Sequence, residues 1–323
     1  MKEIVIPKTE LKVSALCLGG GPHGVDPEES EKVLDYYLAS GGNFIDTANI
    51  YGQWKPGGGV SVSERFLGKY IKSRKCRNRI VLDTKGAAPH FDTMHVPRVS
   101  RKDILHDIDD SLKNLQVDYV DLYWLHHDDE KISVEEIIVD LVREGKIRYF
   151  GCSNWNTARI REALDYSRKK KIPEFVGNQV MYNLAKYNQE RLDQEIMFGM
   201  TSEMYALHKK EGLAVMCYSS QAQGYFSCAD KEDCMENPFY DNPREFYENE
   251  ISRLRLKKVK VLAKKYQCDP TQIALKYMLC KDAFPTIPII GSGRLSEVKL
   301  SIEAMGIPLT KEECEYLEND AKE

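Results

Sequence analysis

Two residues that could move a proton lie close together in the stretch NFIDTANIYGQW, residues 43–54. Asp46 ends a short apolar run, and Tyr51 follows it in a segment that contains a glycine. An aspartate at such a place is often a turn former. A tyrosine hydroxyl titrates at about 10, and a nearby ammonium group lowers that value. The pair is therefore either turn chemistry or half of an active site.

A lysine and a histidine follow the next two apolar runs, and together they favour the second interpretation. Lys85 follows residues 80–84, and His126 follows residues 120–125. Lys85 could lower the value at which Tyr51 titrates, while Asp46 pairs with the lysine and holds it. His126 could donate a hydrogen bond to a carbonyl substrate. Such a set could protonate an alkoxide near neutral pH, but the hydride would have to come from a cofactor.

The elements that would position these residues alternate between short apolar runs and segments with helical periodicity. Ser61 with Glu64 and Ser133 with Glu136 form capping-box patterns, and Gly145 lies where a helix would end. Eight strands, each followed by a helix, predict a single domain over residues 1–323, a (β/α)8 TIM barrel whose active site lies at the carboxyl ends of the strands. The eight runs cover residues 14–18, 43–46, 80–84, 120–125, 147–151, 175–179, 214–218 and 286–290.

Two segments depart from the minimal barrel. Residues 3–13 predict an N-terminal hairpin that closes the bottom of the barrel. Residues 227–249, after the seventh strand, are polar, aromatic and proline-containing, and they predict a long loop of the kind that forms lids and binding sites.

Composition excludes several classes of protein. The net charge of −4 leaves no electrostatic footprint for nucleic acid. No run approaches the roughly 18 apolar residues of a membrane span, and the N-terminus has no apolar signal core. The nine cysteines contain no C-x-x-C pair. This predicts reduced cysteines, no disulfide framework and no metal site, in a cytoplasmic protein.

The sequence resembles the aldo-keto reductase family. The matching stretches run in the family's order from about residue 10 to about residue 305: IDTANIYG, DTKG, DLYWLHHDD, EGKIRYFGCSN, NQVMYN, CYSS and PIIGSGR. The resemblance implies that Tyr51 is the general acid/base of a nicotinamide-dependent reductase. Asp46, Lys85 and His126 would complete its catalytic tetrad.

The resemblance also implies where the cofactor binds. Ser153, Asn154 and Gln179 match positions that bind the nicotinamide carboxamide, and Tyr218 matches the residue that stacks on the nicotinamide ring. The remaining expected cofactor contacts are Gly20, Asp46, Ser219, Gly291, Ser292, Arg294, Glu297 and Ser301. Arg294 suits a 2′-phosphate, whereas Glu297 stands where relatives often have a basic residue. We therefore expect NADPH, with NADH as the alternative.

The substrate pocket departs from the family's pattern. Gly20, Gly21 and Gly86 stand at or beside positions where bulkier residues are common, which predicts a thinner pocket wall. Trp54 and His127 are the expected lining residues. With Asp128 nearby, such a pocket suits a hydroxylated substrate such as a sugar or polyol carbonyl, unless Phe239, Tyr240 and Tyr247 refill it.

Two other functions remain open at this point. Some relatives are auxiliary proteins of ion channels, so the chain could be a cofactor-binding regulatory subunit. A barrel lyase could instead use Lys85 as a Schiff-base nucleophile. The sequence gives neither the physiological substrate, the direction of the reaction nor the oligomeric state.

Overall fold

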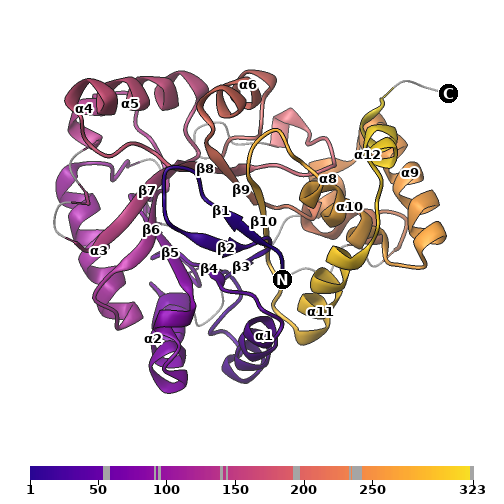
Figure 1. Ribbon diagram of the computed structural model, residues 1–323, viewed down its shortest axis with the longest axis horizontal. Coiled ribbons are helices and arrows are strands. Elements are labelled where there is room, and N and C mark those ends of the chain that lie inside the picture. The colour runs from indigo at the N-terminus through magenta and orange to yellow at the C-terminus, as the bar shows by residue number, and fades with distance from the viewer. Residues whose placement is uncertain are drawn as a thin grey trace.

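A closed barrel of eight parallel strands forms the centre of the molecule (Figure 1). The computed structural model describes residues 1–53, 59–90, 92–93, 96–138, 141–142, 145–191, 197–232, 234 and 242–320. Around the barrel the strands follow the order β10-β3-β4-β5-β6-β7-β8-β9. This confirms the predicted (β/α)8 barrel. The strands are β3 (Cys17–Gly19), β4 (Phe44–Asp46), β5 (Val81–Gly86), β6 (Val120–Leu125), β7 (Ile147–Ser153), β8 (Gly177–Met181), β9 (Ala214–Tyr218) and β10 (Thr286–Ile290).

Helices surround the barrel, and most begin at a polar residue that caps the first turn. The side chain of Asp26 accepts from Glu29 N at 3.1 Å, and Asp269 forms a capping box with Gln272. The α-helices are α1 (Pro27–Ala39), α2 (Val62–Arg74), α3 (Arg101–Leu115), α4 (Val134–Ile137), α5 (Thr157–Lys170), α6 (Ser202–Glu211), α7 (Tyr225–Cys228), α8 (Pro243–Tyr247), α9 (Glu250–Tyr266), α10 (Pro270–Leu279), α11 (Leu295–Glu303) and α12 (Lys311–Glu318). No helix within the described ranges combines the length and the apolar character needed to cross a bilayer.

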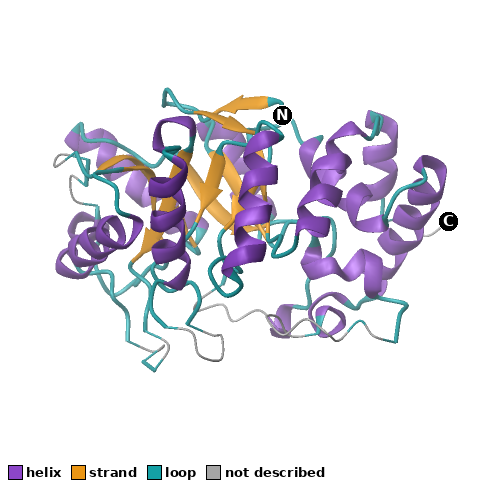
Figure 2. Ribbon diagram, turned by 90° about the horizontal axis from the view of Figure 1, so that it is seen from below, coloured by secondary structure: helices purple, strands orange, loops and turns teal. Residues whose placement is uncertain are grey.

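The N-terminal hairpin closes one end of the barrel, as the sequence predicted. Strands β1 (Glu3–Val5) and β2 (Lys12–Ser14) pair antiparallel, with Glu3 opposite Ser14. Figure 1 shows the hairpin across the middle of the barrel, and Figure 2 shows it beyond one end of the strands. Its buried residues Ile6, Leu11 and Val13 form one apolar cluster with Cys17, Phe44, Val81, Ala214 and Ile287 of the barrel strands and with Val176, which precedes β8. The opposite end, where the strands finish, is therefore the end available for a site.

One helix-start prediction and one helix-end prediction were wrong in detail. Ser61 precedes α2 but adopts a left-handed φ of 57°, and its hydroxyl donates to the carbonyl of Asn49 at 2.8 Å instead of capping the helix. Glu64 turns inward and accepts from Thr84 Oγ1 at 2.7 Å. Helix α4 ends at Ile137, so Gly145, with a φ of 72°, does not cap it.

The segment after β9 is partly helical rather than one long loop, because it contains α7 and α8. The expectation that all cysteines are reduced was also wrong: Cys228 and Cys234 form a disulfide, with their Cα atoms 4.8 Å apart. The chain turns directly after α7, which brings two cysteines six residues apart within bonding range. The other seven cysteines are free.

Candidate active site

Lys85 is the centre of the candidate site, because its ammonium group has three hydrogen-bond acceptors. Nζ donates to Asp46 Oδ2 at 2.7 Å, to the carbonyl of Thr47 at 2.8 Å and to the phenol oxygen of Tyr51 at 3.0 Å. An ammonium group has three protons and no lone pair, so these bonds use all of its donors. The phenol oxygen of Tyr51 therefore accepts from Lys85, and its own proton is not part of that bond.

The register of two neighbouring strands brings Asp46 and Lys85 together. In the β4–β5 ladder Asp46 is aligned with Asp83, and alternate side chains of β5 point to the same face. Asp83 and Lys85 thus both point into the barrel beside Asp46. All three side chains are buried. Tyr51 reaches the group from the segment after β4, where Tyr51 N donates to the carbonyl of Ala48 at 3.1 Å.

The neighbours of Lys85 keep its side chain charged. Burial alone would lower the pKa of Lys85, but the carboxylate of Asp46 outweighs this effect, and the pKa is raised above its ordinary value. The ammonium also lies 4.5 Å from the centre of the Tyr51 ring. Lys85 is therefore a permanent cation next to a phenol.

His126 lies at the same end of the barrel as a neutral imidazole. Burial, the neighbouring His127 and the charge of Lys85, in that order, lower the pKa of His126 well below its ordinary value. The rings of His126 and Tyr51 meet edge to face, with centroids 6.4 Å apart. A neutral imidazole carries one N–H group, so His126 could donate one hydrogen bond to a substrate carbonyl.

The predicted carboxamide-binding residues lie at the ends of β7 and β8, and they make polar contacts with neighbouring strand ends. Gln179 Nε2 donates to Asp46 Oδ1 at 2.8 Å, so β8 is tied directly to the Lys85 group. Asn154 Nδ2 donates to Ser153 Oγ and to the carbonyl of His126, each at 3.2 Å. Tyr218 OH donates to Asn154 Oδ1 at 2.9 Å. These amides and the partly exposed Tyr218 ring fit the carboxamide and the ring of a nicotinamide.

The loops after β9 and β10, together with α11, hold the other predicted cofactor residues except Gly20 and Asp46. Ser219 has a left-handed φ of 50°, and Gln221 donates to Ser301 Oγ at 3.4 Å, which links the loop after β9 to α11. Ser292 is buried and Gly291 is exposed. The side chain of Arg294 is 74% exposed, so it can reach an anion in solution.

The carboxylate of Glu297 accepts hydrogen bonds at the N-terminus of α11. Its Oε2 accepts from Gly293 N at 2.9 Å and from Arg294 N at 3.1 Å. A carboxylate in this position satisfies free N–H groups and complements the helix dipole. Part of its charge is therefore compensated within the protein.

Two glycines that were predicted to thin the pocket wall have a different role. A Cβ on Gly20 would lie 2.6 Å from the carbonyl oxygen of Asp46, so glycine there permits close contact with β4. A Cβ on Gly86 would collide with the phenol of Tyr123 and lie 2.7 Å from Asp107 Cβ. Gly86 makes room for α3, outside the barrel, and does not face a substrate.

The predicted substrate-binding residues are only partly visible. Trp54, Phe239 and Tyr240 lie outside the described residues. His127 is partly exposed, with its ring centroid 5.0 Å from that of His126.

Two further residues named for the pocket are engaged elsewhere. Asp128 cannot serve a substrate freely, because Arg159 Nε and Nη2 donate to its two oxygens at 2.7 and 2.9 Å. Tyr247 is fully buried among aromatic neighbours, so it does not refill the pocket.

Two residues of the site were missed in the sequence. Thr47 acts through its backbone carbonyl, which no side-chain pattern reveals. Asp83 stands two positions before Lys85 in a buried run, and the period of two places both side chains on one face. That signal was present in the sequence.

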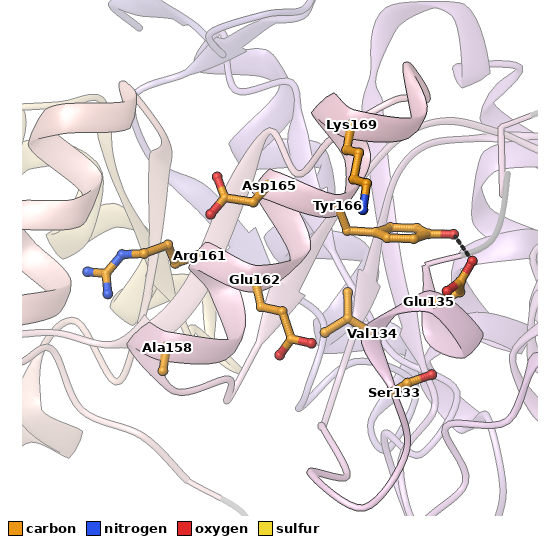
Figure 3. A pocket seen from close by; sticks show the side chains of 9 residues that line it. All are labelled: Ser133, Val134, Glu135, Ala158, Arg161, Glu162, Asp165, Tyr166 and Lys169. Carbon is orange, nitrogen blue, oxygen red and sulfur yellow. Dashed lines mark hydrogen bonds between the residues drawn. The ribbon is translucent and has the colours of Figure 1, made fainter.

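A groove on the outside of the barrel is distinct from this site. It has a volume of about 590 Å³ and lies between α4 and α5. Figure 3 shows its mixed charges, with Tyr166 OH donating to Glu135 at 3.3 Å. None of the tetrad residues lines it, and its charged groups are those of two solvated helix faces. The lining residues are Ser133, Val134, Glu135, Ala158, Arg161, Glu162, Asp165, Tyr166 and Lys169.

Comparison with known proteins identifies the family. The profile of the Aldo/keto reductase family matches residues 15–321, so the chain belongs to this family. Norsolorinic acid reductase B of Dothistroma septosporum is 29% identical over 332 residues, covering 97% of this chain and 79% of that protein. An uncharacterized oxidoreductase of Bacillus subtilis, YrpG, is 30% identical over 322 residues, covering 97% and 93%. The chain is therefore an oxidoreductase of a family that uses nicotinamide cofactors.

A solved structure supports the fold. A thermostable aldo-keto reductase, Tm1743, in complex with the inhibitor epalrestat, aligns with a TM-score of 0.73 and 24% identity. The alignment covers 99% of this chain and all of the other. At this identity the likeness concerns the barrel alone.

Proposed function

We propose that the protein is an NADPH-dependent carbonyl reductase, working also as an alcohol dehydrogenase in reverse, with Tyr51 as general acid/base. The observation that carries this proposal is the pair of hydrogen bonds from Lys85 Nζ to Asp46 and to Tyr51. A bound nicotinamide would supply or accept the hydride at the carbonyl carbon. The protein's own side chains would handle the proton and hold the substrate.

The proton moves at the phenol oxygen of Tyr51. When a carbonyl is reduced, the developing alkoxide takes the phenol proton, and the resulting phenolate still accepts from Lys85 Nζ. The buried cation therefore stabilises the charge that forms on the half-buried Tyr51. His126, as a neutral donor, would hold the carbonyl oxygen near the phenol.

The expected nicotinamide site lies beside this group. Ser153, Asn154 and Gln179 offer amide and hydroxyl groups to the carboxamide, and Tyr218 offers a flat ring held by its bond to Asn154. Because Gln179 also donates to Asp46, the site for the nicotinamide and the proton donor share one hydrogen-bond network.

NADPH is the proposed cofactor because Arg294 is exposed and guanidinium suits a phosphate. Glu297 lies 3.8 Å from Arg294 Nε but is engaged by two backbone N–H groups, which reduces its repulsion of a 2′-phosphate. Titration of intrinsic tryptophan fluorescence with NADPH and NADH measures the preference. Tighter binding of NADH would contradict this part of the proposal.

The proposed substrate is a small aldehyde, ketone or sugar-like carbonyl compound. His127 and Trp54 are the proposed lining residues. Because Asp128 is bound by Arg159, the preference for hydroxylated substrates now depends on His127 alone. A screen of sugars, aldehydes, ketones and steroids tests it, and sugars that react no better than simple aldehydes would refute that preference.

Replacement of Tyr51 by phenylalanine tests the mechanism. Tyr51→Phe should lower kcat by about 10²- to 10⁴-fold, the usual contribution of a positioned acid, while cofactor affinity stays within about twofold. Full activity in this variant would end the proposal. A wild-type protein that binds cofactor tightly but reduces no carbonyl would instead point to the regulatory alternative.

Schiff-base chemistry at Lys85 is disfavoured by the geometry. A nucleophilic amine needs a lone pair, but this amine is held protonated by Asp46 and its three protons are all donated. Borohydride should therefore trap no carbonyl compound on Lys85.

A further inference from the structure

Besides Asp46, a second carboxyl group, that of Asp83, lies next to the hydrogen-bonded set of Asp46, Lys85 and Tyr51. The proposed mechanism does not use Asp83. Its side chain is fully buried in the barrel, and among the described residues no N–H or O–H group donates a hydrogen bond to either of its oxygens. In the β4–β5 ladder it is aligned with Asp46. Two carboxyl groups thus share one cation, Lys85.

The groups around Asp83 do not support a second negative charge. Lys85, on the same strand, already pairs with Asp46 at 2.7 Å. The other titratable neighbour is Cys17 of β3, whose thiol pKa is raised by burial and then by Asp83 and Asp46. Strand β6 contributes the indole of Trp124, whose nitrogen is buried with no partner of hydrogen-bond geometry among the described residues. The interior therefore holds one cation and two acids.

Physical chemistry decides which acid is neutral. Asp46 has two short donors, Lys85 and Gln179, which stabilise a carboxylate. Asp83 has neither. Burial and the charge of Asp46 raise the pKa of Asp83 well above its ordinary value, and the indole of Trp124 opposes them only in part. Burial of an unpaired, ionised carboxylate here would cost a large free energy, whereas burial of a protonated carboxyl group costs far less.

We propose that Asp83 holds a proton at neutral pH and donates it to Asp46, and so controls how much of the charge of Lys85 acts on Tyr51. The carbonyl oxygen of the protonated group then faces the indole N–H of Trp124. Asp83 is thus a positioning residue, and this role rests on the proposed function of Tyr51. A donor to Asp46 disperses the carboxylate's charge, so that Lys85 stabilises the phenolate more strongly.

Two variants separate the proton from the shape of the side chain. Asp83→Asn keeps the shape, a donor toward Asp46 and an acceptor toward Trp124, but it cannot ionise. Asp83→Leu keeps similar volume and removes the donor. The matched control is Glu64→Gln, because Glu64 is a second buried carboxyl whose pKa burial raises, but it bonds Thr84 on the outer side of β5.

Infrared spectroscopy at neutral pH tests the proton without any need for activity. The carbonyl band of a protonated carboxyl should be present in the wild-type protein and in Glu64→Gln, and the component from Asp83 should be lost in Asp83→Asn. A wild-type spectrum that Asp83→Asn leaves unchanged would overturn the proposal. This result does not depend on whether the protein is a reductase.

The pH profile of kcat/KM for reduction tests the coupling to Tyr51. Asp83→Asn should keep the wild-type alkaline limb, which is the fall in kcat/KM at high pH as Tyr51 loses its proton. Asp83→Leu should move this limb about one pH unit higher, because Asp46 then neutralises Lys85 more fully. An unmoved limb in a folded Asp83→Leu protein, or equal displacement in both variants, would refute the coupling. Absence of any reductase activity in the wild-type protein would refute the proposed function instead.

Discussion

Removal of the charge of Lys85 or of Asp46 should move the alkaline limb of the kcat/KM profile for reduction. The two substitutions should move it in opposite directions. Lys85 Nζ lies 3.0 Å from the phenol oxygen. With an effective dielectric constant of about 20, the ammonium stabilises a phenolate by about 5.5 kcal/mol. Asp46 Oδ2 lies 2.7 Å from Nζ, so it is at most about 5.7 Å from the phenol oxygen and opposes the phenolate by at least about 3 kcal/mol.

These values translate into shifts that are easily measured, at about 1.4 kcal/mol for each pH unit. Asp46→Asn leaves the cation uncompensated and should move the limb down by about 2 units. Lys85→Met removes the cation, and the isolated Asp46 then takes up a proton because an unpaired buried charge is costly. The net loss of about 2.5 kcal/mol should move the limb up by nearly 2 units.

The assay is kcat/KM for carbonyl reduction from neutral to strongly alkaline pH, with saturating cofactor. Cofactor affinity is measured separately by fluorescence, because Gln179 connects Asp46 to the expected nicotinamide site. Shifts in the same direction for both variants would refute the electrostatic reasoning. An unmoved limb in both would show that the limb belongs to a group other than Tyr51.

Two further predictions concern stability. Burial lowers the pKa of His23 from 6.5 to about 4, so the unfolded chain binds more protons than the folded chain in that range. The free energy of unfolding therefore falls as the pH drops from 6.5 to 4. His23→Leu should reduce this fall by up to about 3 kcal/mol, measured by urea unfolding. An equal fall in both proteins would contradict it. Gly86→Ala should cost about 1–3 kcal/mol because its Cβ collides with Tyr123, whereas Gly306→Ala, with open space around the Cβ, should cost less than 1 kcal/mol; equal urea midpoints would contradict this.

The barrel could be predicted from the sequence because its signals are local. Each buried run before a polar strand end marks a strand, and the order of strands and helices leaves few topologies. The capping box predicted at Ser61 does not form, because both side chains make tertiary hydrogen bonds instead. Glu64 accepts from Thr84, and Ser61 donates to the carbonyl of Asn49. A local pattern cannot reveal which partner lies across a packed interface.

The site was predictable to the extent that its side chains follow strand ends. Asp46, Lys85 and His126 could be placed at one end of the barrel because parallel strands share their direction. The acceptor on Thr47 and the bond from Gln179 depend on three-dimensional proximity, since Gln179 and Asp46 are 133 positions apart in the sequence. The roles assigned to Gly86 and Asp128 failed because a sequence does not show which face of a strand end meets a helix or an arginine.

The arrangement also explains why Tyr51 comes from a loop, whereas Asp46 and Lys85 come from strands. Asp46 and Lys85 form a fully buried ion pair, which is stable only when its remaining groups are satisfied. Gln179 and the carbonyl of Thr47 supply those bonds, and the strands fix the geometry. In the proposed mechanism Tyr51 changes its protonation during turnover, and a hydrogen bond of 3.0 Å joins this loop residue to the network. The buried Asp46–Lys85 pair sets the electrostatic potential at the Tyr51 phenol. A substitution in the pair should therefore change the pH profile, whereas a substitution at Tyr51 should abolish proton transfer.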